Sequence, residues 1–174
     1  MTAMPTRSPT LLALTVVLVG ALAPAAPAAV ASADLWATVN VCDTATNPNT
    51  VGIRASMPGN GTSQRMYMRF EVQFFDRRRN RFVATGSSTR WLRVGTARVR
   101  SVQSGFSFQF APPPPGEQFV MRGRVDYRWK ARRGRRGHRR WVTVLKRKRY
   151  TRAGFLGVEG GDPPGRSEAL CIIR

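Results

Sequence analysis

Hydrophobic and polar residues alternate along several stretches of this chain. Within residues 65–75, one side of the alternation consists entirely of apolar side chains: Met66, Met68, Phe70, Val72 and Phe74. A period of two is that of a β-strand with one buried face and one solvated face. Residues 50–57 and 117–130 show the same period. Helical periodicity is nearly absent after residue 33, so we expect an all-β domain.

Turn residues divide the rest of the chain into further short strands. The sequence Pro58-Gly59-Asn60-Gly61 and the polar residues 76–80 are typical of tight turns, and Pro112–Pro115 cannot pair within a sheet. The remaining candidate strands are residues 34–43, 81–85, 89–94, 105–110, 139–145 and 168–173. About seven to nine short antiparallel strands predict a single immunoglobulin-like β-sandwich over residues 34–174, with a closed barrel as the main alternative.

The first 33 residues differ from the rest. Arg7 is the only charged residue before Asp34, residues 11–23 are an apolar run, prolines follow, and Ala31-Ser32-Ala33 has the small-x-small pattern of a cleavage site. This order predicts a secretory signal peptide, residues 1–33, and a secreted mature chain without a transmembrane segment. The alternative is an uncleaved membrane anchor, but a spanning helix needs about 20 apolar residues, and the prolines interrupt this one earlier.

The two cysteines, Cys42 and Cys171, lie near opposite ends of the mature chain. After export such a pair predicts a disulfide bond. Closing a loop of roughly 130 residues stabilises the fold by about 4 to 5 kcal/mol in the chain-entropy description. Two cysteines without CxxC spacing and one distant histidine, His138, cannot form a four-ligand zinc site, so we expect no metal and no cofactor.

Residues 38–59, TVNVCDTATNPNTVGIRASMPG, are followed by MYMRFEVQFFD at 66–76 and by a cysteine just before the C-terminus. Together these features resemble small, uncharacterised exported proteins of high-GC actinobacteria with an immunoglobulin-like β-sandwich. The resemblance implies a β-sandwich and a disulfide between the first and last strands. It covers most of the mature chain, but its motifs are structural, and it brings no activity, ligand or catalytic residue.

The chain is strongly basic, with 29 Lys and Arg against 9 Asp and Glu, and 26 of the basic residues are Arg. Such a surface attracts polyanions because binding releases condensed counterions. The excess of Arg accompanies many Ala, Gly and Pro, a composition typical of GC-rich genomes. The positive charge therefore has two explanations, codon usage and selection for an anionic partner.

The basic residues are densest between 122 and 152, where 15 Lys and Arg accompany one acid, Asp126. Strand patterns before and after residues 131–140 predict a hairpin whose loop, with Gly134 and Gly137, projects into solvent. We interpret Trp129 and Trp141 as core residues of the two strands. The candidate polyanion contacts are Lys130, Arg132, Arg133, Arg135, Arg136, Arg139, Arg140, Lys146, Arg147, Lys148 and Arg149.

The sequence offers little for catalysis. No nucleophile elbow, phosphate-binding loop or HExxH motif is present, and His138 lies in the Arg-rich loop. Most acids adjoin Arg, as Asp126 does, so surface ion pairs are favoured over paired catalytic carboxylates. We expect a protein without enzymatic activity, with a carboxylate-based hydrolase as the remaining catalytic alternative.

Two functions are compatible with these features. The first, which the sequence favours, is a secreted immunoglobulin-like structural or interaction domain that binds a partner protein or the cell envelope. The second is a cationic protein that uses the hairpin at 130–149 to bind a polyanion, namely a cell-envelope polymer, extracellular nucleic acid or an anionic lipid surface. Sequence-specific nucleic-acid binding is disfavoured because the mature chain predicts no helix for a major groove.

Overall fold

The structure is a computed structural model that describes residues 35–174, and this range forms nine β-strands. The strands are β1 (Trp36–Cys42), β2 (Thr50–Pro58), β3 (Arg65–Asp76), β4 (Arg81–Ser88), β5 (Leu92–Thr96), β6 (Ser101–Gln109), β7 (Phe119–Arg133), β8 (Arg140–Tyr150) and β9 (Cys171–Ile173). None of the described residues forms a helix that could cross a membrane. The predicted signal peptide, residues 1–33, lies outside the described residues.

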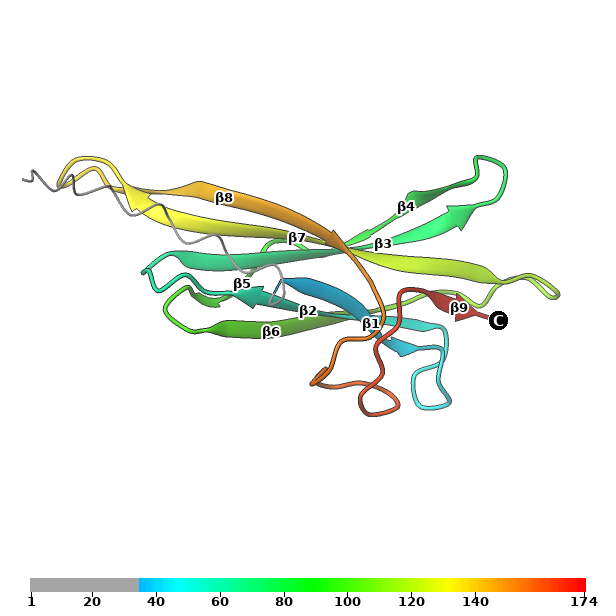
Figure 1. Ribbon diagram of the computed structural model, residues 1–174. Coiled ribbons are helices and arrows are strands. Elements are labelled where there is room, and N and C mark those ends of the chain that lie inside the picture. The colour runs from blue at the N-terminus through cyan, green and yellow to red at the C-terminus, as the bar shows by residue number, and fades with distance from the viewer. Residues whose placement is uncertain (1–34) are drawn as a thin grey trace, which may run out of the picture.

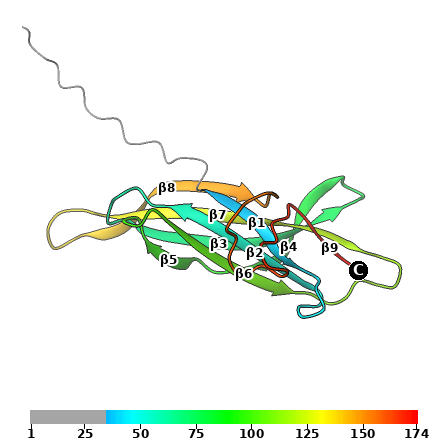
Figure 2. The ribbon, with the colours of Figure 1, turned by 60° about the horizontal axis from the view of Figure 1, so that its bottom comes forward.

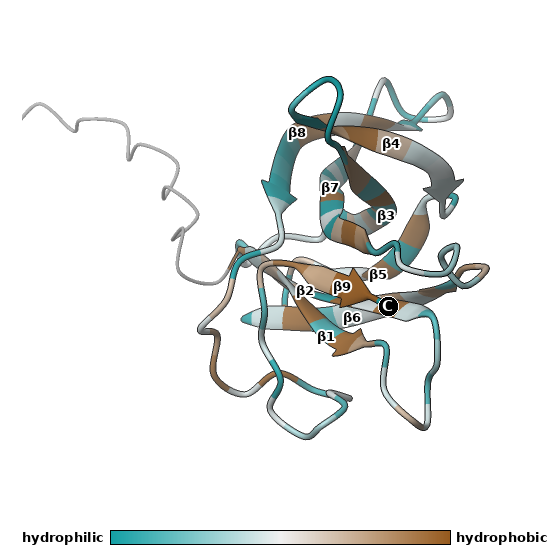
Figure 3. Cartoon of the chain, turned by 90° about the vertical axis from the view of Figure 1, so that its right-hand side faces the viewer, coloured by the Kyte–Doolittle hydropathy of each residue, from teal (hydrophilic) through white to brown (hydrophobic). Residues whose placement is uncertain are grey.

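The strands form two antiparallel sheets that pack face to face (Figures 1 and 3). One sheet has three strands in the order β1-β2-β6, and the other has six. In the larger sheet the order β4-β3-β7-β8 is extended by β5, which pairs with β3, and by β9, which pairs with β7. The prediction of an all-β sandwich is confirmed, while the immunoglobulin-like classification stays a prediction.

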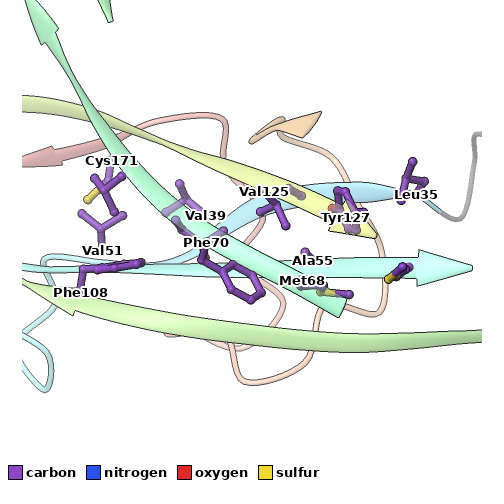
Figure 4. Close-up of a cluster of buried hydrophobic side chains, with 14 of the residues drawn as sticks. Leu35, Val39, Val51, Ala55, Met68, Phe70, Phe108, Val125, Tyr127 and Cys171 are labelled. Carbon is purple, nitrogen blue, oxygen red and sulfur yellow. The ribbon is translucent and has the colours of Figure 1, made fainter. Parts of the chain in front are cut away.

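The core lies between the two sheets and includes the faces that alternation predicts, together with residues of the fully buried strand β1. Each of the three strands predicted from clear alternation contributes a fully or almost fully buried row, and Figure 4 shows part of the cluster. The rows are Val51, Ile53, Ala55 and Met57 from β2; Met66, Met68, Phe70 and Val72 from β3; and Met121, Val125, Tyr127 and Trp129 from β7. The larger sheet thus has one dry face and one wet face, and the wet face carries its polar residues.

The hairpin between β7 and β8 differs from the expected one in the extent of its strands. Pairing continues to the contact of Arg133 with Arg140, and β8 runs on to Tyr150. The predicted ten-residue loop at 131–140 is therefore a connection over residues 134–139 only. Alternation does not identify this part of the hairpin as strand, because Arg occupies both faces of the strands near the tip.

The long connection between β8 and β9, residues 151–170, covers β1. Its Glu168 exchanges backbone hydrogen bonds with Val39, of 2.9 and 3.0 Å, along the open edge of the strand. The Asn40 amide donates to the carbonyl oxygen of Gly160 at 2.6 Å, and Thr38 lies 2.9 Å from the Ser167 hydroxyl. The connection explains why β1 is buried along its whole length and cannot pair with another strand.

A disulfide joins Cys42 in β1 to Cys171 in β9, with their Cα atoms 5.3 Å apart. Because β9 pairs with β7, the bond ties the smaller sheet to the larger one. Both cysteines are buried in the core. The predicted pairing is confirmed.

Two polar side chains of β7 also connect the layers. The Tyr127 hydroxyl donates to the carbonyl oxygen of Trp36 at 2.7 Å, and the Trp129 indole N–H donates to that of Pro58 at 3.2 Å. Both side chains are fully buried, so each hydrogen bond satisfies a group that has no access to water. Burial of the phenol raises the pKa of Tyr127 well above its ordinary value, although the charge of Arg149 acts in the opposite direction.

Reduction of the disulfide should lower the free energy of unfolding by about 4 to 5 kcal/mol, because the reduced unfolded chain regains the entropy of a loop spanning 129 residues. Urea unfolding of the oxidised and reduced protein measures the difference. Thiol titration of the unfolded, unreduced protein should find no free thiol, and two titratable thiols would contradict the assignment.

Tyr127 should make the fold sensitive to alkali. The unfolded chain releases the phenolic proton near pH 10, whereas the folded protein keeps it, so stability falls as pH rises above about 10. Replacing Tyr127 with Phe should cost about 1 to 2 kcal/mol at pH 7, because the Trp36 carbonyl loses its partner. Urea unfolding of both proteins from about pH 8 to 11 should show their difference shrinking above pH 10. A constant difference would contradict the prediction.

Candidate functional site

The tip of the β7–β8 hairpin extends beyond the rest of the sandwich as an arm, which comprises residues 133–140 (Figures 1 and 2). The turn at its tip is closed by a 3.0 Å hydrogen bond from the His138 N–H to the Arg135 carbonyl. Gly134 has a φ of 120°, and a Cβ atom there would lie 2.6 Å from the carbonyl oxygen of His138. Glycine is therefore required at this position. His138 is exposed in the turn, and so are the neighbouring Arg side chains.

The wet face of the larger sheet carries basic side chains from several neighbouring strands. Arg65 of β3 lies opposite Lys130 of β7, and Arg128 of β7 lies opposite Lys146 of β8. Alternation places all outward residues of these strands on one surface. We call this surface the cationic face, and its basic residues are Arg65, Arg69, Arg93, Arg122, Arg124, Arg128, Lys130, Arg132, Lys146 and Lys148.

The two acids on the cationic face, Glu71 and Asp126, are engaged by arginines. Asp126 contacts Arg69 at 2.7 Å and Arg124 at 3.1 Å, and Glu71 contacts Arg124 at 3.4 Å. Burial acts to lower the pKa of Arg124, but the two carboxylates outweigh it and raise that pKa. The expected surface ion pairs are present for both acids. Of the two sequence neighbours of Asp126, Arg124 pairs with it, whereas Arg128 lies over Trp91. The second partner, Arg69, comes from β3.

Aromatic rings lie beneath several of the remaining cations. The Arg128 guanidinium lies 3.8 Å from the centre of the Trp91 ring, and that of Arg65 lies 3.9 Å from Trp141. Three further rings on this face contact Lys or Arg at 4.1 to 5.5 Å: Tyr67, Phe82 and Tyr150. Stacking fixes a guanidinium plane while its N–H groups stay available to a ligand.

Of the two tryptophans expected in the core, only Trp129 is there. Trp141 is half-buried on the cationic face, opposite Arg132, so its assignment to the core is wrong. The cause is a β-bulge in β8: Trp129 pairs with Leu145, but the next residue of β7 pairs with Thr143. The unpaired Val144 shifts the alternation by one residue and turns Trp141 outward.

The predicted polyanion contacts divide among three places. The arm holds Arg133, Arg135, Arg136, Arg139 and Arg140 at or near its tip. The cationic face holds Lys130, Arg132, Lys146 and Lys148. Arg147 and Arg149 lie on the other face of β8, opposite the buried Tyr127 and Val125, and do not join the cationic face.

The sequence reasoning missed the part of the cationic face that comes from β3 and the middle of β7. Arg65, Arg69, Arg122 and Arg128 were not among the candidate contacts. Alternation already placed Arg69 and Arg122 on outward positions. The sequence did not show that β3 and β8 both pair with β7. This pairing brings the four missed arginines beside the predicted contacts of the hairpin.

The cluster Lys146–Arg149 also has a structural role. The strand β8 is an end strand of the larger sheet, and the described residues provide no partner on its other side. Figure 3 shows the end of β8 as a hydrophilic stretch. Charged residues on both faces of an end strand oppose pairing with another chain, because they keep the strand hydrated.

Replacing Asp126 with Asn should lower the free energy of unfolding by about 1 to 3 kcal/mol, because Arg69 and Arg124 lose a charged acceptor and then repel each other. Urea unfolding measures the change. Glu117→Gln is the matched control, since Glu117 is exposed and makes no ion pair in the described part of the chain. Its stability should stay within about 0.5 kcal/mol of the parent. Equal effects of the two variants would contradict a structural role for Asp126.

No protein-family model matches this sequence, and a search of curated proteins gives no significant match. The resemblance to exported actinobacterial proteins therefore stays a prediction. Function has to be inferred from the residues themselves.

Proposed function

We propose that this protein is an exported, non-enzymatic domain that binds polyanions through the cationic face and the arm. The observation that carries the proposal is the pairing of β3, β7 and β8 as neighbours, which gathers basic residues from three strands on one surface. The two acids of that surface are already bound by Arg69 and Arg124. The remaining cations therefore have no acidic partner among the described residues.

The spacing of the cations suits an extended polymer. Outward residues of one strand recur every ~6.7 Å, and neighbouring strands lie ~4.8 Å apart. Strand β7 has 15 residues, which gives it a length of about 50 Å, and the arm continues its row of cations. A chain of phosphates or other anions lying along β7 can contact several cations at once and release a counterion at each.

The aromatic rings favour recognition of charge rather than of bases. Trp91 and Trp141 could act as stacking platforms for nucleic-acid bases, but Arg128 and Arg65 cover them at 3.8 and 3.9 Å. A ligand then meets the guanidinium groups first. Because these groups are held in place by stacking, less side-chain entropy is lost on binding. We expect binding that depends on charge density and salt, and little on base sequence.

Export and classification are part of the proposal. The disulfide between Cys42 and Cys171 supports an oxidising compartment outside the cytoplasm, and it agrees with the signal peptide that the sequence predicts. Two antiparallel sheets joined by a disulfide between layers support an immunoglobulin-like classification. In the extracellular setting the available polyanions are envelope polymers, released nucleic acid and anionic lipid headgroups.

A protein partner is the second candidate, and one cavity favours it. A cleft of about 980 Å³ lies at the end of the sandwich, between the β3–β4 turn and the segment before β7. Phe74, Phe75 and Phe119 line it together with Arg77 and Arg78. Such a mixture of aromatic and Arg side chains is typical of protein interfaces.

Binding of the purified, oxidised protein to heparin, a single-stranded oligonucleotide and polyphosphate should be measured over a range of salt concentrations. We expect all three to bind, and log K should fall linearly with log salt by about 0.7 to 0.9 per anion contacted. A face variant removes three cations: Arg65→Ser, Arg128→Ser and Lys130→Ser. A tip variant removes three others: Arg135→Ser, Arg136→Ser and Arg139→Ser. Each variant should bind at least about tenfold more weakly than the parent, and the slope of log K against log salt should become about 2 to 3 less steep.

The matched control removes three exposed arginines from the β3–β4 turn: Arg77→Ser, Arg78→Ser and Arg79→Ser. All three variants have the same net charge, so the control should keep most of the affinity if position matters. A control as weak as the face variant would attribute binding to net charge alone. No binding by the parent near 0.15 M salt would reject the proposal and leave the protein partner as the better candidate.

A further inference from the structure

The strand β6 ends the three-stranded sheet and has a partner on one side only. It pairs with β2 over its whole length, from the contact of Thr50 with Gln109 to that of Pro58 with Ser101. Within residues 35–174 no strand lies on its other side. In an antiparallel sheet alternate residues of an end strand direct their N–H and C=O groups away from the sheet. These groups are available to another strand.

The other end strands of the sandwich are protected. The edge of β1 is occupied by Glu168, β8 carries the charged cluster Lys146–Arg149, and β4 begins with Arg81. The strands β5 and β9 are only five and three residues long, and β5 includes Arg93. In contrast, β6 has nine residues, and no charged residue occurs between 101 and 116. It is the long end strand of the described fold that lacks the usual defences against pairing.

We propose that β6 pairs with the β6 strand of a second copy of this chain, in an antiparallel two-fold arrangement that joins the two smaller sheets into one. Like charges directly opposite each other destabilise a strand pair. Pairing through β8 would place its cations against those of the other copy, whereas pairing of β6 with itself opposes only uncharged residues. A two-fold contact of a strand with itself is also self-complementary by symmetry.

The charges at the ends of β6 favour the antiparallel orientation. Arg98 and Arg100 lie just before the strand and are exposed, while the residues after it up to Gly116 are uncharged. Antiparallel pairing places the two arginines of one copy beside the uncharged end of the other. A parallel arrangement would place all four arginines together.

Exposed apolar side chains at this edge give the contact a hydrophobic component. The side chain of Phe106 is 44% exposed although its ring packs 4.9 Å from that of Phe108, which belongs to the core. Val99, just before the strand, is 47% exposed. A second copy along β6 would cover part of both side chains and thereby bury apolar area that the single chain leaves in water.

The dimer and polyanion binding should respond to salt in opposite directions. Each chain has a formal net charge of +20, so two copies repel at low ionic strength. Salt screens this repulsion, since the Debye length falls from about 30 Å at 0.01 M to about 8 Å at 0.15 M. Dimerisation should therefore strengthen with salt, whereas polyanion binding weakens. The inference does not rest on the proposed function, and either can fail alone.

Sedimentation velocity of the purified, oxidised protein should be measured from about 1 to 200 µM, in about 0.05 M and 0.5 M NaCl. We expect a monomer–dimer equilibrium with a lower Kd at the higher salt concentration. The edge variant is Ser107→Lys with Gln109→Lys, because both side chains are exposed on the outward face of β6 and make no hydrogen bond within the described residues. Its Kd should rise by at least about tenfold.

The matched control adds two lysines away from β6, by Val144→Lys in β8 and Ala153→Lys in the long connection, both at exposed positions. It should dimerise like the parent, and circular dichroism should show that both variants are folded. A parent that stays monomeric at both salt concentrations would overturn the proposal. So would an edge variant that dimerises as well as the parent, or a control that loses the dimer equally.

Hydrogen exchange provides the second measurement. In a β6 dimer, the outward amides of β6 should gain protection as protein concentration rises, while those of β8 should not. A different result is that the β6 amides gain protection only when other exported proteins are added. That result would assign this edge to a strand of a different protein and would overturn self-pairing.

Discussion

The pairing of β3 with β7 is the interaction on which the rest of this structure depends. Ten consecutive residue pairs, from Arg65 with Lys130 to Phe74 with Met121, hold the two strands in one register. Because side chains alternate, this register places Phe70 and Val125 in the core and the basic residues on the opposite surface. A slip of one residue would expose the core row and bury the arginines. Hydrophobic burial therefore fixes the positions of the charges.

The sequence was sufficient to predict where most strands lie along the chain, but not which strands pair with one another. Alternation identified the buried faces of β2, β3 and β7, because burial imprints its period on the residues of a single strand. The two cysteines were paired correctly, because the chain contains no others. Strand order depends on contacts between distant segments, which periodicity in a single strand does not record. For this reason Arg65 and Arg128 were not linked to the hairpin, although both had been placed on strands.

Trp141 shows a second limit, at the level of a single residue. Trp141 and Leu145 are separated by an even number of positions in the sequence, so strict alternation assigns both side chains to the same face of the strand. One extra residue, Val144, reverses that assignment and converts an expected core tryptophan into a support for Arg65. The bulge has no marker in the sequence, since it contains no glycine or proline. Near such a bulge the hydrophobicity of an aromatic residue does not predict which face of the sheet it occupies, because the pairing of the two strands decides its direction.

The distribution of charge between the two sheets bears on whether Arg reflects codon usage or function. Codon usage acts on the whole chain, so it should add Arg to every exposed strand position. Yet β6 contains no charged residue, and its exposed outward positions are Ser or Gln. The strands β1 and β2 do not bear on this question, because they are almost entirely buried. The strands β3, β7 and β8 contain the basic residues instead. Composition alone does not produce this contrast between β6 and the cationic face, whereas the proposed polyanion site on one sheet and the proposed neutral pairing edge on the other both account for it.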